Sequence, residues 1–138
     1  MRIFVSYSFS DADLARTLTD VIDGTINRYQ ESSEIYGFGT SNLSSDIWPH
    51  KIREALRLAD AMVVLWTERS SKSPGQLVEV GVAWFREMDI HVVLCGTSAQ
   101  SLPSPFLAER HATGWLDFPA AFDRYVRDYF DKKRSAAE

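Results

Sequence analysis

The chain has a single cysteine, Cys95, which excludes an internal disulfide and suits a reducing compartment. Long apolar runs are absent, since none approaches the roughly 20 residues that a helix needs to cross a bilayer. There is no excess of positive charge either: the formal net charge of −4 gives no sign of a nucleic-acid partner or an anionic-membrane surface. The residues after Met1 run directly into strand-like sequence rather than a secretory signal, so we expect a cytoplasmic protein.

Histidine is also scarce, and its distribution gives no metal site. The three residues, His50, His91 and His111, are scattered, and each is expected to be structural or exposed rather than catalytic. What remains is an ordinary globular composition, with 45% hydrophobic and 25% charged residues in 138 positions. This length fits one domain over residues 1–138 with a substantial core.

Short apolar runs alternate with helical periodicities along the whole chain. Strands are predicted at residues 2–7, 34–38, 61–66, 90–95 and 115–118. Helices are predicted at residues 11–28, from about 45 to 58, from 73 to about 88, and from 119 onward. Ser10 and Asp13 form a capping-box-like start for the first helix, and Ser73 is expected to cap the third. This order predicts a flavodoxin-like α/β fold, an open parallel five-stranded sheet of order 2-1-3-4-5 with helices on both faces.

The third predicted helix carries an acid in an apolar setting. Glu79 lies within the run Ser73-Pro74-Gly75-Gln76-Leu77-Val78-Glu79-Val80-Gly81-Val82-Ala83-Trp84-Phe85. None of its neighbours one turn away is a cation, and Gly75 and Ala83 are small enough to leave space beside the carboxylate. A lone Glu of this kind is a candidate for chemistry. The alternatives are that Glu79 faces solvent or pairs with Arg86.

The predicted topology brings Glu79 to a ligand-binding position. In open parallel sheets, ligands bind beyond the carboxyl ends of the strands where the strand order reverses, here between the first and third strands. Together with the start of the third helix, these two strand ends provide the candidate substrate contacts Ser6, Tyr7, Ser8, Phe9, Trp66, Thr67, Ser73 and Gly75.

Several motifs together resemble a TIR (Toll/interleukin-1 receptor) domain of the bacterial NAD-cleaving type. The run Ile3-Phe4-Val5-Ser6-Tyr7-Ser8 before an acid-capped helix looks like the first TIR box. The helix at residues 47–58 followed by the strand at 61–65 is similar to the second TIR helix and third strand, and residues 115–118 fit the last strand. The resemblance covers nearly the whole chain and places Glu79 where TIR domains carry the glutamate of their NAD-cleaving site.

The resemblance implies further site residues, partners and a cellular role. Trp48 falls about where the animal axon-degeneration TIR enzyme has an aromatic for nucleotide stacking, and Thr40 stands in the loop after the second strand, where an acid is common. Gly75 replaces the aromatic or bulky residue frequent four positions before the glutamate. NAD is expected as substrate, with no other cofactor, in a homo-oligomer formed through TIR–TIR contacts. The polar loop at residues 39–45 is expected to be mobile in an isolated protomer and to rearrange over the crevice. A stand-alone protein of this kind resembles the signal-generating component of Thoeris-like antiphage systems, which acts on a separate effector protein.

Two other readings stay open. The spacing from Ser73 through Gly75 to Glu79 also resembles nucleoside 2-deoxyribosyltransferases, although that family has an acid where this chain has Ser73. The second alternative is a non-catalytic TIR module that acts through protein–protein interaction. Both enzyme families break an N-glycosidic bond through an oxocarbenium-like transition state, which a carboxylate stabilises or attacks. For NAD, the expected products are nicotinamide with ADP-ribose or with a cyclic ADP-ribose-type messenger.

Overall fold

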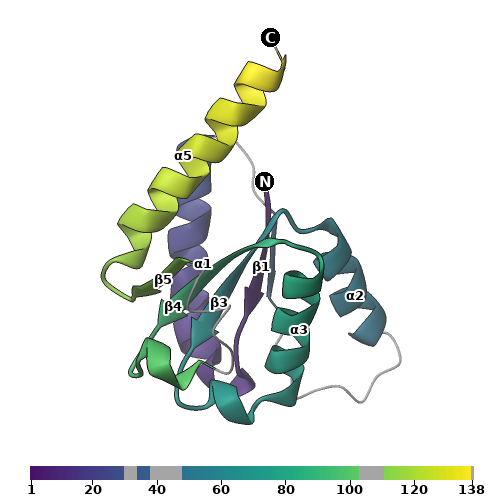
Figure 1. Cartoon of the computed structure of the whole chain (residues 1–138), viewed down its shortest axis with the longest axis vertical. Helices are drawn as coiled ribbons and strands as arrows, with labels where there is room; N and C mark the ends of the chain where they lie inside the picture. The colour runs from purple at the N-terminus through teal and green to yellow at the C-terminus, as the bar shows by residue number, and fades with distance from the viewer. Residues whose placement is uncertain (30–33, 38–47, 103–110, 138) are drawn as a thin grey trace.

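A computed structural model describes residues 1–29, 34–37, 48–102 and 111–137 of the chain. Five parallel strands form one sheet in the order β2-β1-β3-β4-β5, which confirms the predicted fold class (Figure 1). The strands are β1 (Arg2–Ser6), β2 (Glu34–Gly37), β3 (Ala61–Trp66), β4 (Asp89–Leu94) and β5 (His111–Gly114). The α-helices of the described residues are α1 (Ala12–Asn27), α2 (Trp48–Leu58), α3 (Pro74–Phe85) and α5 (Phe118–Ala137). Short 3-10 helices lie at Phe9–Asp11, Ser70–Lys72 and Ala99–Ser101.

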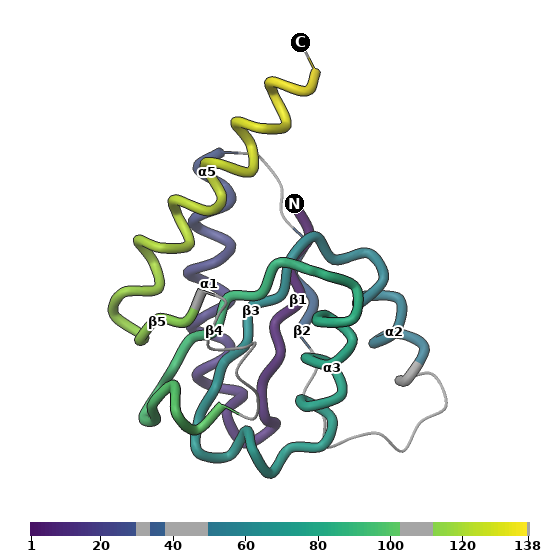
Figure 2. Tube along the Cα trace, viewed as in Figure 1, coloured from purple at the N-terminus to yellow at the C-terminus, as the bar shows by residue number. Residues whose placement is uncertain are grey.

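The helices cover both faces of the sheet, as the trace in Figure 2 shows. α1 and α5 pack on one face, against residues such as Ile3 and Val63. α2 and α3 pack on the other face, against residues such as Phe4 and Met62. All six positions of β3 are therefore buried, which explains why this strand is an unbroken apolar run in the sequence.

The prediction of the fifth strand at residues 115–118 is wrong. The strand lies immediately before that segment and pairs in parallel with β4, from His91 opposite His111 to Leu94 opposite Gly114. Phe118 begins α5 and is buried there, in the layer formed with α1. The bulky residues that suggested a strand thus belong to the turn and helix that follow it, whereas β5 itself contains small residues that give little apolar signal.

Two helix starts show different capping. The predicted capping box of Ser10 and Asp13 is not formed: Asp11 is the N-cap of α1, and its side chain makes no capping hydrogen bond. The cap of α3 is as predicted, because the Ser73 side chain accepts a hydrogen bond from the backbone N–H of Gln76, with Pro74 in the first turn. The predicted α2 start near residue 45 and the loop at residues 39–45 lie outside the described residues.

α3 ends earlier than the sequence predicted, at Phe85 rather than near Met88. Glu87 adopts a left-handed conformation with φ of 56°, which turns the chain into β4. At its other end, α3 follows the loop after β3. The helix therefore starts at the carboxyl edge of the sheet, beside the end of β1.

Candidate functional site

The inner face of α3 carries two polar residues where it packs on the sheet. Its buried positions, three and four residues apart, are Gln76, Glu79, Val80 and Ala83. The side-chain amide of Gln76 donates hydrogen bonds to the backbone carbonyls of Leu65 at 2.9 Å and Ser6 at 3.3 Å. α3 is thereby held against the carboxyl ends of β1 and β3, as the topology predicted.

Glu79 is an acid buried without a cationic partner. It is 2% exposed, and the hydroxyl of Ser6 donates a 2.9 Å hydrogen bond to its Oε1 atom. Its Oε2 atom is also buried and has no hydrogen-bond partner among the described residues. Burial raises the pKa of Glu79 to about 8, although the Ser6 hydrogen bond acts in the opposite direction. Neither solvent exposure nor an ion pair with Arg86 therefore explains this carboxyl group, since an unpaired buried acid costs stability.

A groove of about 860 Å³ between α2 and α3 reaches Glu79. This volume is within the range of small-molecule sites. Glu79 is the one acid among its lining residues, which otherwise are apolar or basic: Ile52, Arg53, Leu56, Arg57, Pro74, Gly75, Val78, Val82 and Arg86. The groove is thus lined by apolar residues, three arginines and one acidic residue.

Two aromatic residues, Tyr7 and Phe9, follow the end of β1. Tyr7 is half-buried, and both its burial and the negative charge of Glu79 raise the pKa of its phenol. A Cβ atom at Gly37 would lie 3.5 Å from the Tyr7 ring, an ordinary van der Waals contact, so the ring lies beside the end of β2. Phe9 is half-exposed, at 50%. Ser8 is buried, and its backbone carbonyl accepts a 2.8 Å hydrogen bond from the N–H of Asp11.

Residues 3–131 match the family model described as TIR domain. The chain belongs to the TIR domain family. This TIR domain is also similar to a solved prokaryotic SEFIR domain, at 17% sequence identity and a TM-score of 0.52, over 91% of this chain and 90% of that one. At this identity the likeness shows a shared fold. A comparison with curated proteins finds no match.

The remaining residues predicted to bind substrate lie in different settings in this TIR domain. Gly75 lines the groove with Glu79. Trp66 is buried in the core beneath α2 and α3, and its indole N–H donates a 3.0 Å hydrogen bond to Ser101. Ser73 is engaged as the cap of α3. Thr40 lies outside the described residues, and the structure does not describe the Trp48 side chain.

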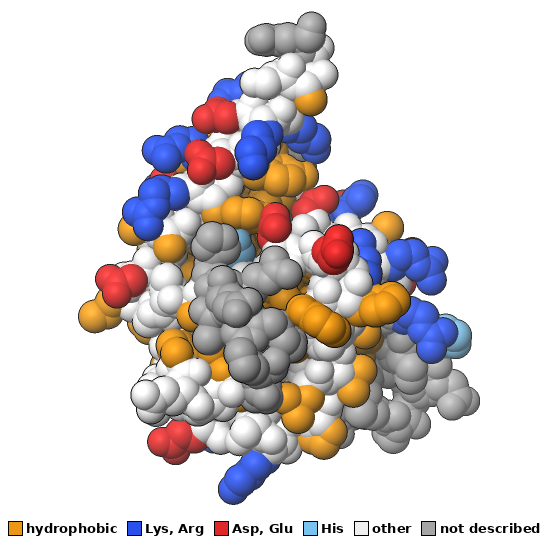
Figure 3. All heavy atoms as spheres, in the orientation of Figure 1, with side chains coloured by type: hydrophobic (Ala, Val, Ile, Leu, Met, Phe, Trp, Pro, Cys, Tyr) orange, Lys and Arg blue, Asp and Glu red, His pale blue; other side chains and the backbone are white. Residues whose placement is uncertain are grey.

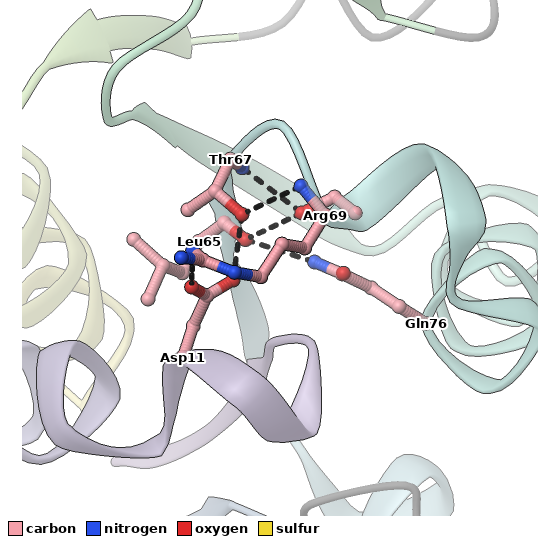
Figure 4. Close-up of polar contacts among 6 residues, drawn as sticks. Asp11, Leu65, Thr67, Arg69 and Gln76 are labelled. Atoms are coloured by element: carbon pink, nitrogen blue, oxygen red, sulfur yellow. Dashed lines mark hydrogen bonds and ion pairs between the residues drawn. The ribbon is translucent and has the colours of Figure 1, made fainter.

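Thr67 belongs to a second polar cluster, which joins the loops after β1 and β3 (Figure 4). The buried Asp11 carboxylate accepts hydrogen bonds from the Thr67 hydroxyl at 2.6 Å and from the Arg69 guanidinium at 2.7 Å. The Ser70 hydroxyl accepts from the Thr67 N–H and donates to the Leu65 carbonyl, which also receives the Gln76 amide. This cluster fixes the edge of the sheet next to Ser6.

Sequence reasoning missed Asp11 and Gln76. The helical period places Gln76 on the same face as Glu79, three residues before it, but it does not show that the amide bonds to the ends of β1 and β3. Asp11 gives no such signal, because an acid at the start of a helix is ordinarily exposed. Its burial depends on Thr67 and Arg69, which lie more than 50 positions away in the sequence.

Metal-ligating side chains do not gather among the described residues. They contain no group of three or more His, Cys, Asp or Glu side chains that could hold a metal ion. Within the same residues, no helix is both long and apolar enough to cross a membrane.

Proposed function

We propose that this TIR domain cleaves NAD at the bond between nicotinamide and ribose, with Glu79 as the catalytic carboxylate. The observation that supports it most is Glu79, a residue of the groove lining whose buried Oε2 has no hydrogen-bond partner in the described structure. Breaking this bond develops positive charge at the ribose C1′ atom. A carboxylate held in a low-dielectric site stabilises that charge strongly.

The leaving group explains why a single acid suffices. Nicotinamide departs with the bonding electron pair from a ring that was cationic, so it leaves as a neutral molecule and needs no proton from a general acid. Water then attacks C1′ and loses a proton, which gives ADP-ribose. Attack by a nucleophilic atom of the same molecule gives a cyclic ADP-ribose-type product instead. Both outcomes are compatible with the groove.

The protonation state of Glu79 links binding to chemistry. A pKa of about 8 leaves most of the carboxyl groups protonated at neutral pH in the free protein. A positively charged nicotinamide ring beside the group favours the ionised form, because an opposite charge lowers the pKa of a carboxyl. Binding of NAD would therefore release a proton and create the negative charge that the transition state requires.

Other features of the groove suit the rest of NAD. Arg53, Arg57 and Arg86 supply positive charge that complements the pyrophosphate. Phe9, at the start of the 3-10 helix that follows β1, is half-exposed, and we propose that Phe9 or Trp48 stacks on one of the flat rings. Ser6, Tyr7 and Gly75 would contact the ribose side, with Ser8 and Thr67 nearby. A contact of Thr40 with the substrate stays a prediction from the sequence. Trp66 already bonds to Ser101, and Ser73 caps α3. We therefore propose that these two residues position the site and do not contact NAD.

The proposed setting is a signalling system. A TIR enzyme that makes an ADP-ribose-type messenger for a separate effector would fit a Thoeris-like antiphage role. Support for this step is membership of the TIR domain family.

The experiment is incubation of purified protein with NAD, with chromatographic separation of nicotinamide, ADP-ribose and cyclic products. We expect nicotinamide release by the wild type, loss in Glu79→Gln, and wild-type activity in the control Glu68→Gln, which removes an exposed carboxylate. Base exchange on deoxynucleosides without NAD cleavage would instead identify a deoxyribosyltransferase.

A non-catalytic interaction module is the second candidate. One observation favours it, namely the exposed apolar residues on the outer face of α3. Absence of NAD cleavage across a wide range of protein concentrations, with self-association retained, would support the module and contradict the enzyme.

A further inference from the structure

The polarity of α3 is inverted relative to an ordinary surface helix. Its one amide and its one acid, Gln76 and Glu79, are only 0% and 2% exposed, whereas its outer positions are apolar. Figure 3 shows apolar side chains at the surface over α3. A surface helix normally buries apolar residues and exposes polar ones, and a buried polar group costs stability unless it is hydrogen-bonded. The inward position of both side chains therefore indicates a role other than packing.

The amide of Gln76 joins the ends of two neighbouring strands. Its NH2 group donates to the carbonyl of Leu65 in β3 at 2.9 Å and to the carbonyl of Ser6 in β1 at 3.3 Å. Figure 4 shows this side chain extending from α3 toward Leu65. Because both neighbours are acceptors, only the NH2 side of the amide can face them. The Oε1 atom is then left buried with no hydrogen-bond partner in the part of the chain that the structure describes, a cost that an apolar residue here would avoid.

Ser6 is bound to α3 through two of its atoms. Gln76 binds the carbonyl oxygen of Ser6, and Glu79, one helical turn further along, accepts the hydrogen bond of the Ser6 hydroxyl at 2.9 Å. Ser6 is fully buried and lies at the last paired position of β1, opposite Val64 of β3. The backbone at this strand end is therefore fixed by Gln76 as well as by the sheet. A shift of that backbone would change the distance from the Ser6 hydroxyl to Glu79.

We propose that Gln76 is a positioning residue for Glu79 and that it acts through Ser6. Its amide fixes the Ser6 carbonyl and so keeps the Ser6 hydroxyl within hydrogen-bond distance of Oε1. Glu79 is thereby held with Oε1 bonded and with Oε2 available to a molecule in the groove. The catalytic meaning of this arrangement rests on the proposed function, whereas the coupling of Gln76 to Glu79 does not and is tested without NAD.

The titration of Glu79 reports this coupling. Burial raises the pKa of Glu79, and the Ser6 hydrogen bond lowers it. Loss of the Gln76 amide would let the Ser6 backbone move and weaken that bond, so the pKa of Glu79 should rise further. The other ionisable groups near Glu79, at the end of β1 and in the groove lining on α2 and α3, are Tyr7, Arg53, Arg57 and Arg86. A substitution at Gln76 changes none of them.

A double-mutant cycle, read by NMR titration of the Glu79 carboxyl carbon, tests the coupling. The signal is assigned by its loss in Glu79→Gln, and the cycle compares the wild type, Ser6→Ala, Gln76→Met and the double variant. Methionine keeps a long, flexible side chain but donates no hydrogen bond. Each single variant should raise the pKa of Glu79 by at least about 0.5, since a bond that favours ionisation is lost or weakened. The double variant should raise it no further than Ser6→Ala alone, because Gln76 acts only through Ser6.

Ile90→Val is the control for a general loss of stability. Ile90 is fully buried in the layer that α2 and α3 form on the sheet, so the substitution should lower Tm and leave the pKa of Glu79 in place. An unmoved pKa in Gln76→Met, or additive shifts in the double variant, would overturn the proposal. Should Gln76→Met not fold, Gln76→Asn carries the same prediction, because its amide is one methylene shorter and cannot keep both carbonyl contacts.

Kinetics with NAD then separate positioning from substrate contact. Gln76 has no exposed surface, so Gln76→Met should lower kcat and move the midpoint of the pH profile of kcat/KM upward, with KM for NAD changed by less than about twofold. A raised KM with an unmoved midpoint would contradict the positioning role. A wild type that does not cleave NAD would refute the proposed function alone, and the NMR cycle would still decide whether Gln76 acts on Glu79.

Discussion

The hydroxyl of Ser6 donates a 2.9 Å hydrogen bond to Oε1 of Glu79, a residue 73 positions away in the sequence. It is the one hydrogen bond that the described residues give to this carboxyl group. Burial raises the pKa of Glu79 and the Ser6 hydrogen bond lowers it, with burial the larger effect. The pair thus holds a carboxyl group that is protonated in the free protein near neutral pH and is ready to ionise when a positive charge arrives.

Removing the charge of Glu79 should abolish catalysis and leave the fold intact. We expect Glu79→Gln to lower kcat/KM for NAD by at least about 100-fold, the scale of losing one electrostatic stabiliser of a transition state. Initial rates of nicotinamide release would measure this loss, and Glu68→Gln serves as control. A Glu79→Gln variant of near-normal activity would contradict the assignment.

The pKa of Glu79 also predicts how stability depends on pH. Its folded value of about 8 lies above the ordinary 4.5, so the folded protein binds this proton more tightly than the unfolded chain does. The associated stability is fully present below pH 4.5 and is lost as the pH rises from 4.5 to about 8. Urea unfolding at several pH values should show this fall in the wild type, by a few kcal/mol, since one pKa unit is worth roughly 1.4 kcal/mol. In Glu79→Gln the fall should be smaller, and equal slopes in both proteins would argue against a protonated Glu79.

Ser6 should set the pH dependence of activity. Because the ionised carboxylate is the active form, kcat/KM should rise with pH up to about 8 in the wild type. Ser6→Ala removes the hydrogen bond that favours ionisation, so the midpoint of this rise should move to higher pH. Ser10→Ala, which removes an exposed hydroxyl, should leave the midpoint in place. Lower activity of Ser6→Ala with an unmoved midpoint would instead indicate a direct contact of Ser6 with substrate.

Aromatic stacking should appear as a change in KM. Phe9 is half-exposed, so Phe9→Ala removes little packing, yet it should raise the KM for NAD about tenfold if the ring stacks on a base. Trp48→Ala is the parallel variant at the start of α2. Leu116→Ala, at a residue that is 90% exposed, is the control. A sharp drop in Tm with an unchanged KM would show that the aromatic residue packs against the protein instead.

Activity should depend on protein concentration if a second copy completes or orders the site. We expect the specific activity of the wild type to rise across a wide dilution series, because only the associated form would be fully competent. Constant specific activity in a protein that remains monomeric throughout would rule out this coupling without affecting the assignment of Glu79.

The order of strands and helices could be predicted from the sequence because its strongest apolar patterns were reliable. The run Ala61–Trp66 is apolar at every position. Such a run is typical of a strand that is covered by helices on both faces, and the segment is the central strand β3. The last strand was misplaced because its pairing with β4 involves small residues, whereas the bulky residues nearby belong to a turn and to α5. Pairing with a neighbouring strand satisfies the backbone N–H and C=O groups, so a strand such as β5 can form without an apolar pattern in its own sequence.

The sequence by itself determined that Glu79 is an unusual acid, since the helical period shows that no cation lies one turn away. It could also place α3 at the carboxyl edge of the sheet, because right-handed crossovers leave few alternatives. Only the tertiary structure decided which groups meet there: Ser6 on Oε1, the unpartnered Oε2, and the inward position of Trp66. These contacts depend on the register of β1 against β3, which sets Ser6 opposite Val64. Such a register follows from packing of the whole sheet, and no local stretch of sequence contains it.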